Sequence, residues 1–221
     1  MKRLLKSAAA LAALLSAVFY ANAAFSGRVA CGSGFAPTKA MPIAGPNFRP
    51  YCWPCVAALR TFGRVPAINS VVTAFEVMAE KHPNTVLVYG EIGFPNGGIF
   101  RPHRTHRQGL DVDIMVPLKD GRTLTTSVTN RFGYDVEFDA NGDGDDGEID
   151  FAALGDLILE MQREARQRGG DVARVILAPD LQPELRAANP AVFNSVKFNT
   201  RQAWVRHDDH IHVDFVFRCD E

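Results

Sequence analysis

The chain of 221 residues lacks the features of a nucleic-acid-binding or membrane-embedded protein. Its formal charge is only −1 at neutral pH, which excludes a strongly basic nucleic-acid binder. No apolar run of membrane-spanning length follows the first two dozen residues, and internal repeats and Gly-rich phosphate loops are absent. The remaining composition, 47% apolar and 22% charged, is typical of a globular protein.

Residues 1–23 have the organisation of a secretory signal peptide. Lys2 and Arg3 precede an apolar stretch over residues 8–19, and small residues follow at positions 21 and 23. An uncleaved membrane anchor is the alternative, but the apolar stretch is shorter than the roughly 20 residues that cross a bilayer. We expect cleavage after residue 23, a periplasmic or secreted location, and no stable membrane insertion afterwards.

The sequence has only four cysteines, Cys31, Cys52, Cys55 and Cys219. An even number in an exported chain predicts disulfides. Cys52 and Cys55 have the spacing of a thioredoxin-like redox site, but prolines crowd the segment and no βαβ pattern surrounds it, which favours a structural role. Among the three possible pairings, we expect Cys219 to join the C-terminal tail to the N-terminal segment.

Hydrophobic periodicity predicts a single α+β domain with a small, mainly antiparallel sheet flanked by helices. The Gly- and Pro-rich residues 24–66 are expected to form an extended N-terminal arm over the domain of residues 67–221. Helices are predicted over residues 69–81 and 151–167, and strands over residues 86–89, 110–116, 172–177 and 210–217.

Five of the six histidines fall into two short clusters. They are His103 and His106 in the first cluster and His207, His210 and His212 in the second. Each cluster lies beside a predicted strand that carries carboxylates, a combination typical of metal binding. The period of two in a strand places the imidazoles of His210 and His212 on one face.

If strands 110–116 and 210–217 are neighbours, His106, Asp113 and His212 can converge on one ion. Three nitrogen and oxygen ligands leave a fourth position open, which is typical of a catalytic zinc that activates water. His210 shares a face with His212 without having to bind the metal, and is therefore the candidate general base. His103 and His207 are second candidates for orienting the substrate or the developing oxyanion.

Four carboxylates are candidates for fixing the tautomers of the ligating histidines: Asp111, Asp208, Asp209 and Asp214. For each of them, a solvated or helix-capping carboxylate is the alternative.

The sequence resembles the penicillin-insensitive murein endopeptidases, which are zinc peptidases of the lysostaphin, D-alanyl-D-alanine peptidase and hedgehog-like superfamily. The resemblance rests on the segments 103–113 and 207–212, with a Gly-rich loop at residues 95–98. It implies that His106, Asp113 and His212 bind zinc, that His210 is the catalytic histidine, and that His103 and His207 line the site.

The resemblance also implies that residues 67–221 form a metallopeptidase domain acting on peptidoglycan in the periplasm. Its substrate is expected to be the peptide cross-link between D-alanine and meso-diaminopimelate. The chain departs from some family members because the interval between Asp113 and His207 contains no Asp-x-x-His pair, a pattern they use for further metal-site residues.

An acidic segment follows the pattern of a calcium-binding loop. Its candidate ligands are Asp139, Asn141, Asp143, Asp145 and Asp150. A structural Ca²⁺ would relieve the repulsion among the acids of residues 135–150. The alternative is a solvated turn in which Asp150 caps the following helix. Residues 134–138 are expected to form a strand before the loop, so any resemblance to an EF-hand is confined to the loop.

Two other functions remain open from the sequence. A zinc D,D-carboxypeptidase or a peptidoglycan amidase could use the same metal ligands, because these ligands do not determine which bond is presented. A zinc- and calcium-binding extracellular module without turnover is an alternative of another class.

Overall fold

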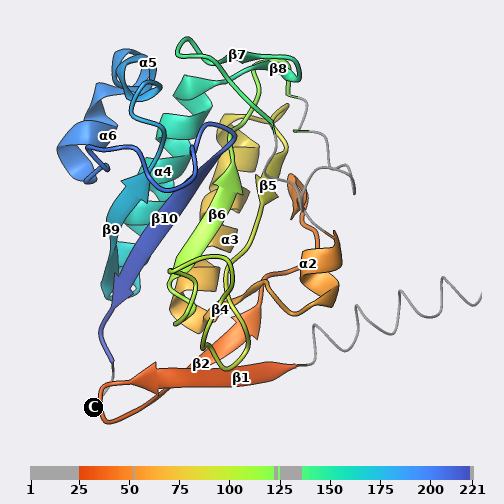
Figure 1. Cartoon of the computed structure of the whole chain (residues 1–221), viewed down its shortest axis with the longest axis vertical. Helices are drawn as coiled ribbons and strands as arrows, with labels where there is room; N and C mark the ends of the chain where they lie inside the picture. Colours follow the sequence, from red (N-terminus) through yellow and green to blue (C-terminus); the bar gives the residue numbers. More distant parts are fainter. Residues whose placement is uncertain (1–24, 52, 122–123, 125–135, 220–221) are drawn as a thin grey trace, which may run out of the picture.

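A computed structural model of the chain describes residues 25–51, 53–121, 124 and 136–219. The predicted signal peptide and Cys52 lie outside these residues. The described part has α+β architecture, as the sequence predicted, and is built around one five-stranded sheet (Figure 1). None of its helices is long and apolar enough to cross a membrane.

The five-stranded sheet carries the predicted histidine strand next to its centre. Its strands, in spatial order, are β3 (Phe48–Pro50), β5 (Leu87–Tyr89), β6 (Asp111–Met115), β10 (His210–Phe217) and β9 (Gly170–Ile176). Only the pair β3 and β5 is parallel, and the other pairs are antiparallel. The expectation of a mainly antiparallel sheet is therefore confirmed.

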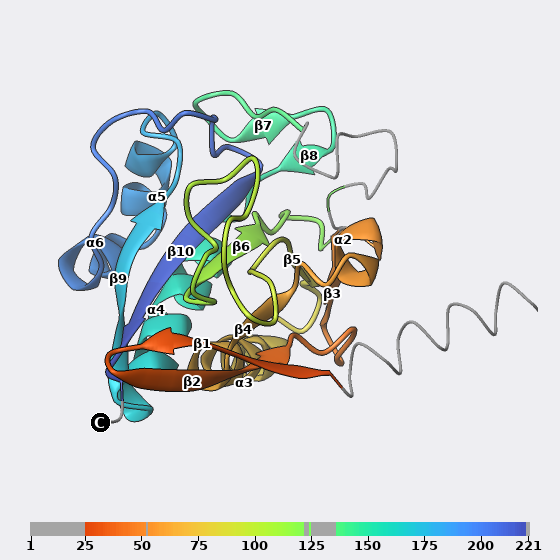
Figure 2. The same ribbon diagram turned by 60° about the horizontal axis from the view of Figure 1, so that its bottom comes forward.

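Helices α3 (Val65–Lys81) and α4 (Phe151–Gln167) pack together behind this sheet (Figures 1 and 2). Helix α3 begins four residues before its predicted start, because Pro66 occupies the first turn, where its missing N–H is not needed. Helix α4 has the predicted bounds. The side chain of Asp150 caps it by accepting a hydrogen bond from the backbone N–H of Ala153 at 2.9 Å.

The remaining helices and one hairpin lie at the periphery of the sheet. They are α2 (Trp53–Ala57), α5 (Gln182–Ala188), α6 (Pro190–Ser195) and the pair β7 (Asp143–Gly144) and β8 (Gly147–Glu148). Periodicity does not predict these elements, because each is shorter than the window in which a helical or strand pattern emerges.

The N-terminal segment forms a second sheet, in the order β1 (Ser26–Cys31), β2 (Gly34–Ala40) and β4 (Phe62–Arg64). Strand β4 holds the loop that carries the first histidine cluster, through hydrogen bonds from Phe62 N to Gly93 O and from Arg64 N to Gly109 O. Gly109 has φ 65°, and a Cβ there would lie 2.9 Å from Arg64 N. Only glycine therefore permits this close approach.

A disulfide joins Cys31 at the end of β1 to Cys219 just after β10. The expected link between the C-terminal tail and the N-terminal segment is confirmed. Cys55 is also disulfide-bonded, which agrees with the expected structural use of the cysteines.

Candidate metal centre

The register of β6 and β10 places two pairs of polar residues directly opposite each other. His212 faces Asp113, and Asp214 faces Asp111. Because side chains alternate along a strand, Ile211 and Val213 and the residues opposite them, Ile114 and Val112, point into the core, while these four polar residues share the opposite face. The expectation that the two strands are neighbours is confirmed.

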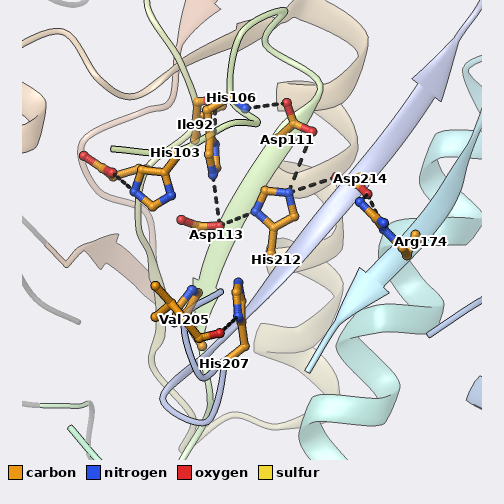
Figure 3. Close-up of polar contacts among 12 residues, drawn as sticks. Ile92, His103, His106, Asp111, Asp113, Arg174, Val205, His207, His212 and Asp214 are labelled. Atoms are coloured by element: carbon orange, nitrogen blue, oxygen red, sulfur yellow. Dashed lines mark hydrogen bonds and ion pairs between the residues drawn. The ribbon is translucent and has the colours of Figure 1, made fainter. Parts of the chain in front are cut away.

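Asp113 is the point on which both histidine clusters converge. Its Oδ1 lies 2.8 Å from Nδ1 of His212 and 3.3 Å from Nε2 of His106 (Figure 3). All three side chains are buried. The two imidazoles and the carboxylate thus present a nitrogen–oxygen donor set of the kind that zinc accepts.

His106 is held in an orientation suited to a metal ligand. Its backbone has φ 60°, outside the usual region for a side-chain-bearing residue, and its N–H donates to Asp111 Oδ2 at 2.8 Å. Its ring Nδ1 lies 3.0 Å from the carbonyl oxygen of Ile92. A carbonyl only accepts, so Nδ1 carries the proton and Nε2 keeps its lone pair.

The lone pair of His106 Nε2 is buried, and among the described residues it has no hydrogen-bond partner. Buried polar atoms normally have such a partner. An imidazole that donates from one nitrogen to a carbonyl and leaves the other nitrogen unsatisfied is the usual arrangement of a metal-bound histidine. The residues present therefore fit a metal ion.

His212 is fixed from its other side by carboxylates. Its Nε2 lies 2.9 Å from Asp214 Oδ1 and 3.8 Å from Asp111 Oδ1. Asp214 in turn accepts a hydrogen bond from Arg174 Nε at 2.7 Å. Both Asp111 and Asp214, two of the candidate acceptors, thus lie beside His212.

In this cluster, interactions between neighbouring side chains outweigh the effect of burial on the pKa values of His212 and Asp113. Burial lowers the pKa of His212, but hydrogen bonds to Asp111, Asp113 and Asp214 outweigh it and hold the pKa well above the ordinary value. Burial likewise raises the pKa of Asp113, yet the neighbouring imidazoles of His106 and His212 outweigh burial and keep this pKa well below its usual range. Asp113 is therefore a carboxylate at neutral pH, the form that binds cations.

His210 forms a buried pair with its neighbour in the chain. Its Nδ1 lies 2.5 Å from Asp209 Oδ1. Burial lowers the pKa of His210, but the charge and the hydrogen bond of Asp209 outweigh it and raise the pKa above the ordinary value. Asp209 thus orients His210, whereas Asp208 accepts from the backbone N–H of Phe138 at 2.9 Å and pairs with Arg206.

His207 lies beside the same pair, with its ring centroid 4.6 Å from that of His210. Burial, followed by the charge of His210, lowers the pKa of His207 to about 3, so the ring is neutral at physiological pH. Its Nδ1 lies 2.9 Å from Val205 O, and because a carbonyl only accepts, Nε2 carries the lone pair. His207 is therefore an acceptor rather than a donor toward the site.

His103 is held by a residue that the sequence analysis did not single out. Its Nε2 lies 2.9 Å from Oε2 of Glu91, and Glu91 also pairs with Arg60. Glu91 is buried, and its pKa stays lowered because hydrogen bonds from His103 and Arg60 outweigh burial, which raises it. The sequence signal that could have identified Glu91 was the position of an acid just after the predicted strand 86–89 and before the Gly-rich loop.

Two groups of described residues have ligand atoms within 4.8 Å of one another: His103, His106 and Asp113 form one, and Asp111, His212 and Asp214 form the other. The contact between Asp113 and His212 joins the two groups. Four of the five clustered histidines thereby lie around or beside Asp113 through ring or side-chain contacts, and His210 adjoins them through His207.

The acidic segment is a tight turn followed by the β7–β8 hairpin. Asp139 accepts from the backbone N–H groups of Asn141 and Asp143 at 2.8 and 3.0 Å. Asp150 caps α4, as the alternative interpretation stated, and neither metal-ligand group includes a residue of this loop. Calcium binding through Asp139, Asn141, Asp143, Asp145 and Asp150 stays a prediction.

The expected strand over residues 134–138 is wrong for its described part. Residues 136–138 form no strand, and the backbone N–H of Phe138 bonds instead to Asp208. Residues 134 and 135 lie outside the described residues.

A buried cluster of two imidazoles and one carboxylate, with oriented histidines beside it, defines this protein as one with a candidate metal centre on an antiparallel sheet. The sequence model of the penicillin-insensitive murein endopeptidases matches residues 27–221. The chain belongs to this family.

Two curated relatives are both named penicillin-insensitive murein endopeptidase, and both come from Klebsiella pneumoniae. The protein of strain ATCC 700721 / MGH 78578 is 23% identical over 181 residues, or 79% of this chain and 60% of the relative. That of strain 342 is 24% identical over 155 residues, or 70% of this chain and 53% of the relative. This chain therefore spans somewhat more than half the length of these relatives.

Proposed function

We propose that this chain is a zinc-dependent murein endopeptidase, exported to the periplasm or beyond. Its substrate is the peptidoglycan cross-link between D-alanine and meso-diaminopimelate, which it hydrolyses by metal-activated water. Family membership and the names of two relatives support the reaction class. The donor set around Asp113 supports the metal dependence.

The observation that carries the proposal is the unsatisfied lone pair of His106 Nε2, buried beside Asp113. A structural histidine would complete this position with a hydrogen bond. His106, Asp113 and His212 would hold the ion through Nε2, a carboxylate oxygen and Nδ1. A bound zinc would supply Lewis acidity, which makes water nucleophilic near neutral pH and polarises the amide carbonyl.

His210 takes the role of general base. It lies on the same strand face as His212 and is oriented by Asp209. In its neutral form it accepts a proton from the attacking water, and the carboxylate of Asp209 stabilises the imidazolium that results. The same imidazolium can then donate the proton to the leaving amine.

His207 and His103 would contact the substrate rather than bind the zinc ion. The neutral ring of His207 presents a lone pair, so it can accept a hydrogen bond from a peptide N–H but cannot stabilise an oxyanion. His103, hydrogen-bonded to Glu91, is the better placed of the two to orient a substrate carbonyl.

The test is digestion of sacculi and of defined muropeptides by the mature chain, with and without a zinc chelator. We expect cross-linked dimers to become monomers, chelator to abolish the reaction, and zinc to restore it. Release of D-alanine from monomeric pentapeptides would instead indicate a carboxypeptidase, and separation of glycan from peptide would indicate an amidase. A protein that binds zinc without cleaving any of these would be a non-catalytic module, which the buried His210–Asp209 pair disfavours.

A further inference from the structure

Trp204 is an exposed indole that lies beside the candidate metal centre. It belongs to the segment between α6 and β10, and 64% of its surface is accessible. Its ring meets the imidazole of His103 edge to face, with centroids 5.9 Å apart and planes at 77°. Tryptophan is usually well buried, so an indole exposed beside such a centre is typical of a residue that contacts a ligand.

The side chain against which Trp204 packs is itself held firmly. His103 bonds to buried Glu91, and its ring lies 5.9 Å from that of Phe100 and 5.1 Å from that of His106. The indole is therefore supported by a fixed imidazole. The contact places Trp204 one ring away from His106, the expected zinc ligand.

The two segments that flank the centre carry charge of one sign. Residues 97–110 and 197–207 contain six basic residues and no acid. They are Arg101, Arg104, Arg107, Lys197, Arg201 and Arg206. All are exposed except Arg206, which is half-buried and paired with Asp180 and Asp208. A ligand with free carboxylates and apolar side chains suits this combination.

We propose that Trp204 contacts the substrate and packs against the part of the peptide next to the bond that is cut. This inference rests on the proposed function, in which the substrate is a peptide with free carboxylates. The aliphatic part of that peptide packs on the indole while its carboxylates lie in the field of the flanking bases. The peptide, rather than the glycan, is the occupant because the contact with His103 places Trp204 beside the centre where the peptide bond is cut.

Steady-state kinetics on a glycan-free cross-linked peptide dimer test this role. Trp204→Ala should raise KM roughly tenfold with kcat and zinc content unchanged, and Trp204→Phe should recover most of the loss. The matched control is Trp53→Ala, because Trp53 is the other tryptophan and is also exposed. An unchanged KM in Trp204→Ala, or a loss of zinc or of the folded state, contradicts the inference.

Fluorescence supplies a test that requires no turnover. Trp53→Phe leaves Trp204 as the single tryptophan, and adding the peptide dimer to this zinc-free variant should change its emission saturably. A saturable change with glycan strands that lack peptide, and none with the dimer, assigns the surface to the glycan and overturns the proposal. If the wild type binds the dimer in this way but cleaves nothing, the proposed function fails while the binding role of Trp204 stands. If the emission does not change at all, Trp204 does not contact the peptide and the proposal is overturned.

Discussion

Asp113 and His212 are direct partners across β6 and β10, and Nδ1 of His212 lies 2.8 Å from Oδ1 of Asp113. The two residues are 99 positions apart in the sequence. A shift of one residue in strand register would turn one of them into the core. The candidate centre therefore depends on the register that the apolar residues of both strands establish.

The carboxylate of Asp214 should tune the affinity for zinc without touching the ion. It accepts from His212 Nε2 and thereby favours the tautomer whose Nδ1 is free to bind. We expect Asp214→Asn to weaken zinc binding about 10- to 100-fold, measured by competition with a chromogenic chelator. Asp180→Asn, at an exposed pair with Arg206, is the control. Equal zinc affinities in Asp214→Asn and Asp180→Asn would show that Asp214 does not influence zinc binding.

His210→Ala should separate catalysis from metal binding. Because His210 is assigned as the base and not as a ligand, its loss should lower kcat by about 10²- to 10⁴-fold while zinc content stays at the wild-type level. Elemental analysis and muropeptide kinetics on the same preparation measure both quantities. Loss of zinc together with activity would show that His210 belongs among the ligands.

The pH profile should report the pair of His210 and Asp209. The pKa of His210 lies above its ordinary value because the effect of Asp209 outweighs burial, and a base must be neutral. The rate therefore rises with pH as His210 loses its proton. In Asp209→Asn the negative charge is gone, so the pKa of His210 falls and the acidic limb of kcat/KM moves to lower pH. A limb that stays in place, or moves upward, contradicts this assignment.

The disulfide between Cys31 and Cys219 should stabilise the chain strongly, because it closes a loop with a sequence separation of 188 residues. We expect the double variant Cys31→Ser with Cys219→Ser to lose about 2–5 kcal/mol of unfolding free energy in urea titrations. Ala30→Ser, at the exposed neighbouring position on β1, is the control. Equal unfolding midpoints for the two variants would show that the link is dispensable.

The sequence predicted those parts whose signal is local. The period of two over residues 210–217 placed His210 and His212 on one face, and an apolar stripe followed by Gly169 and Gly170 delimited α4. The link to Cys219 was expected because the predicted export would make disulfides the default. In the first two cases, residues close in sequence carried the information; the disulfide, whose cysteines are 188 positions apart, is the exception.

The unpredicted parts depend on residues brought together by folding. Glu91 is a single acid whose partners, Arg60 and His103, lie 31 positions before it and 12 positions after it. Strands β1, β2 and β4 pair within a Gly- and Pro-rich segment that has weak alternation. The segment before the acidic loop looked like a strand, but Phe138 uses its backbone N–H to bind Asp208, 70 positions away.

Zinc stoichiometry and affinity of the wild type and of Asp113→Asn test the central claim most directly. The substitution keeps the shape of the side chain and removes the charge on which His106 and His212 converge. We predict about one tightly bound zinc ion per wild-type chain, as expected for a single three-ligand site, and none in the variant, with unchanged circular dichroism. A folded Asp113→Asn variant that binds zinc as tightly as the wild type would contradict the proposed centre.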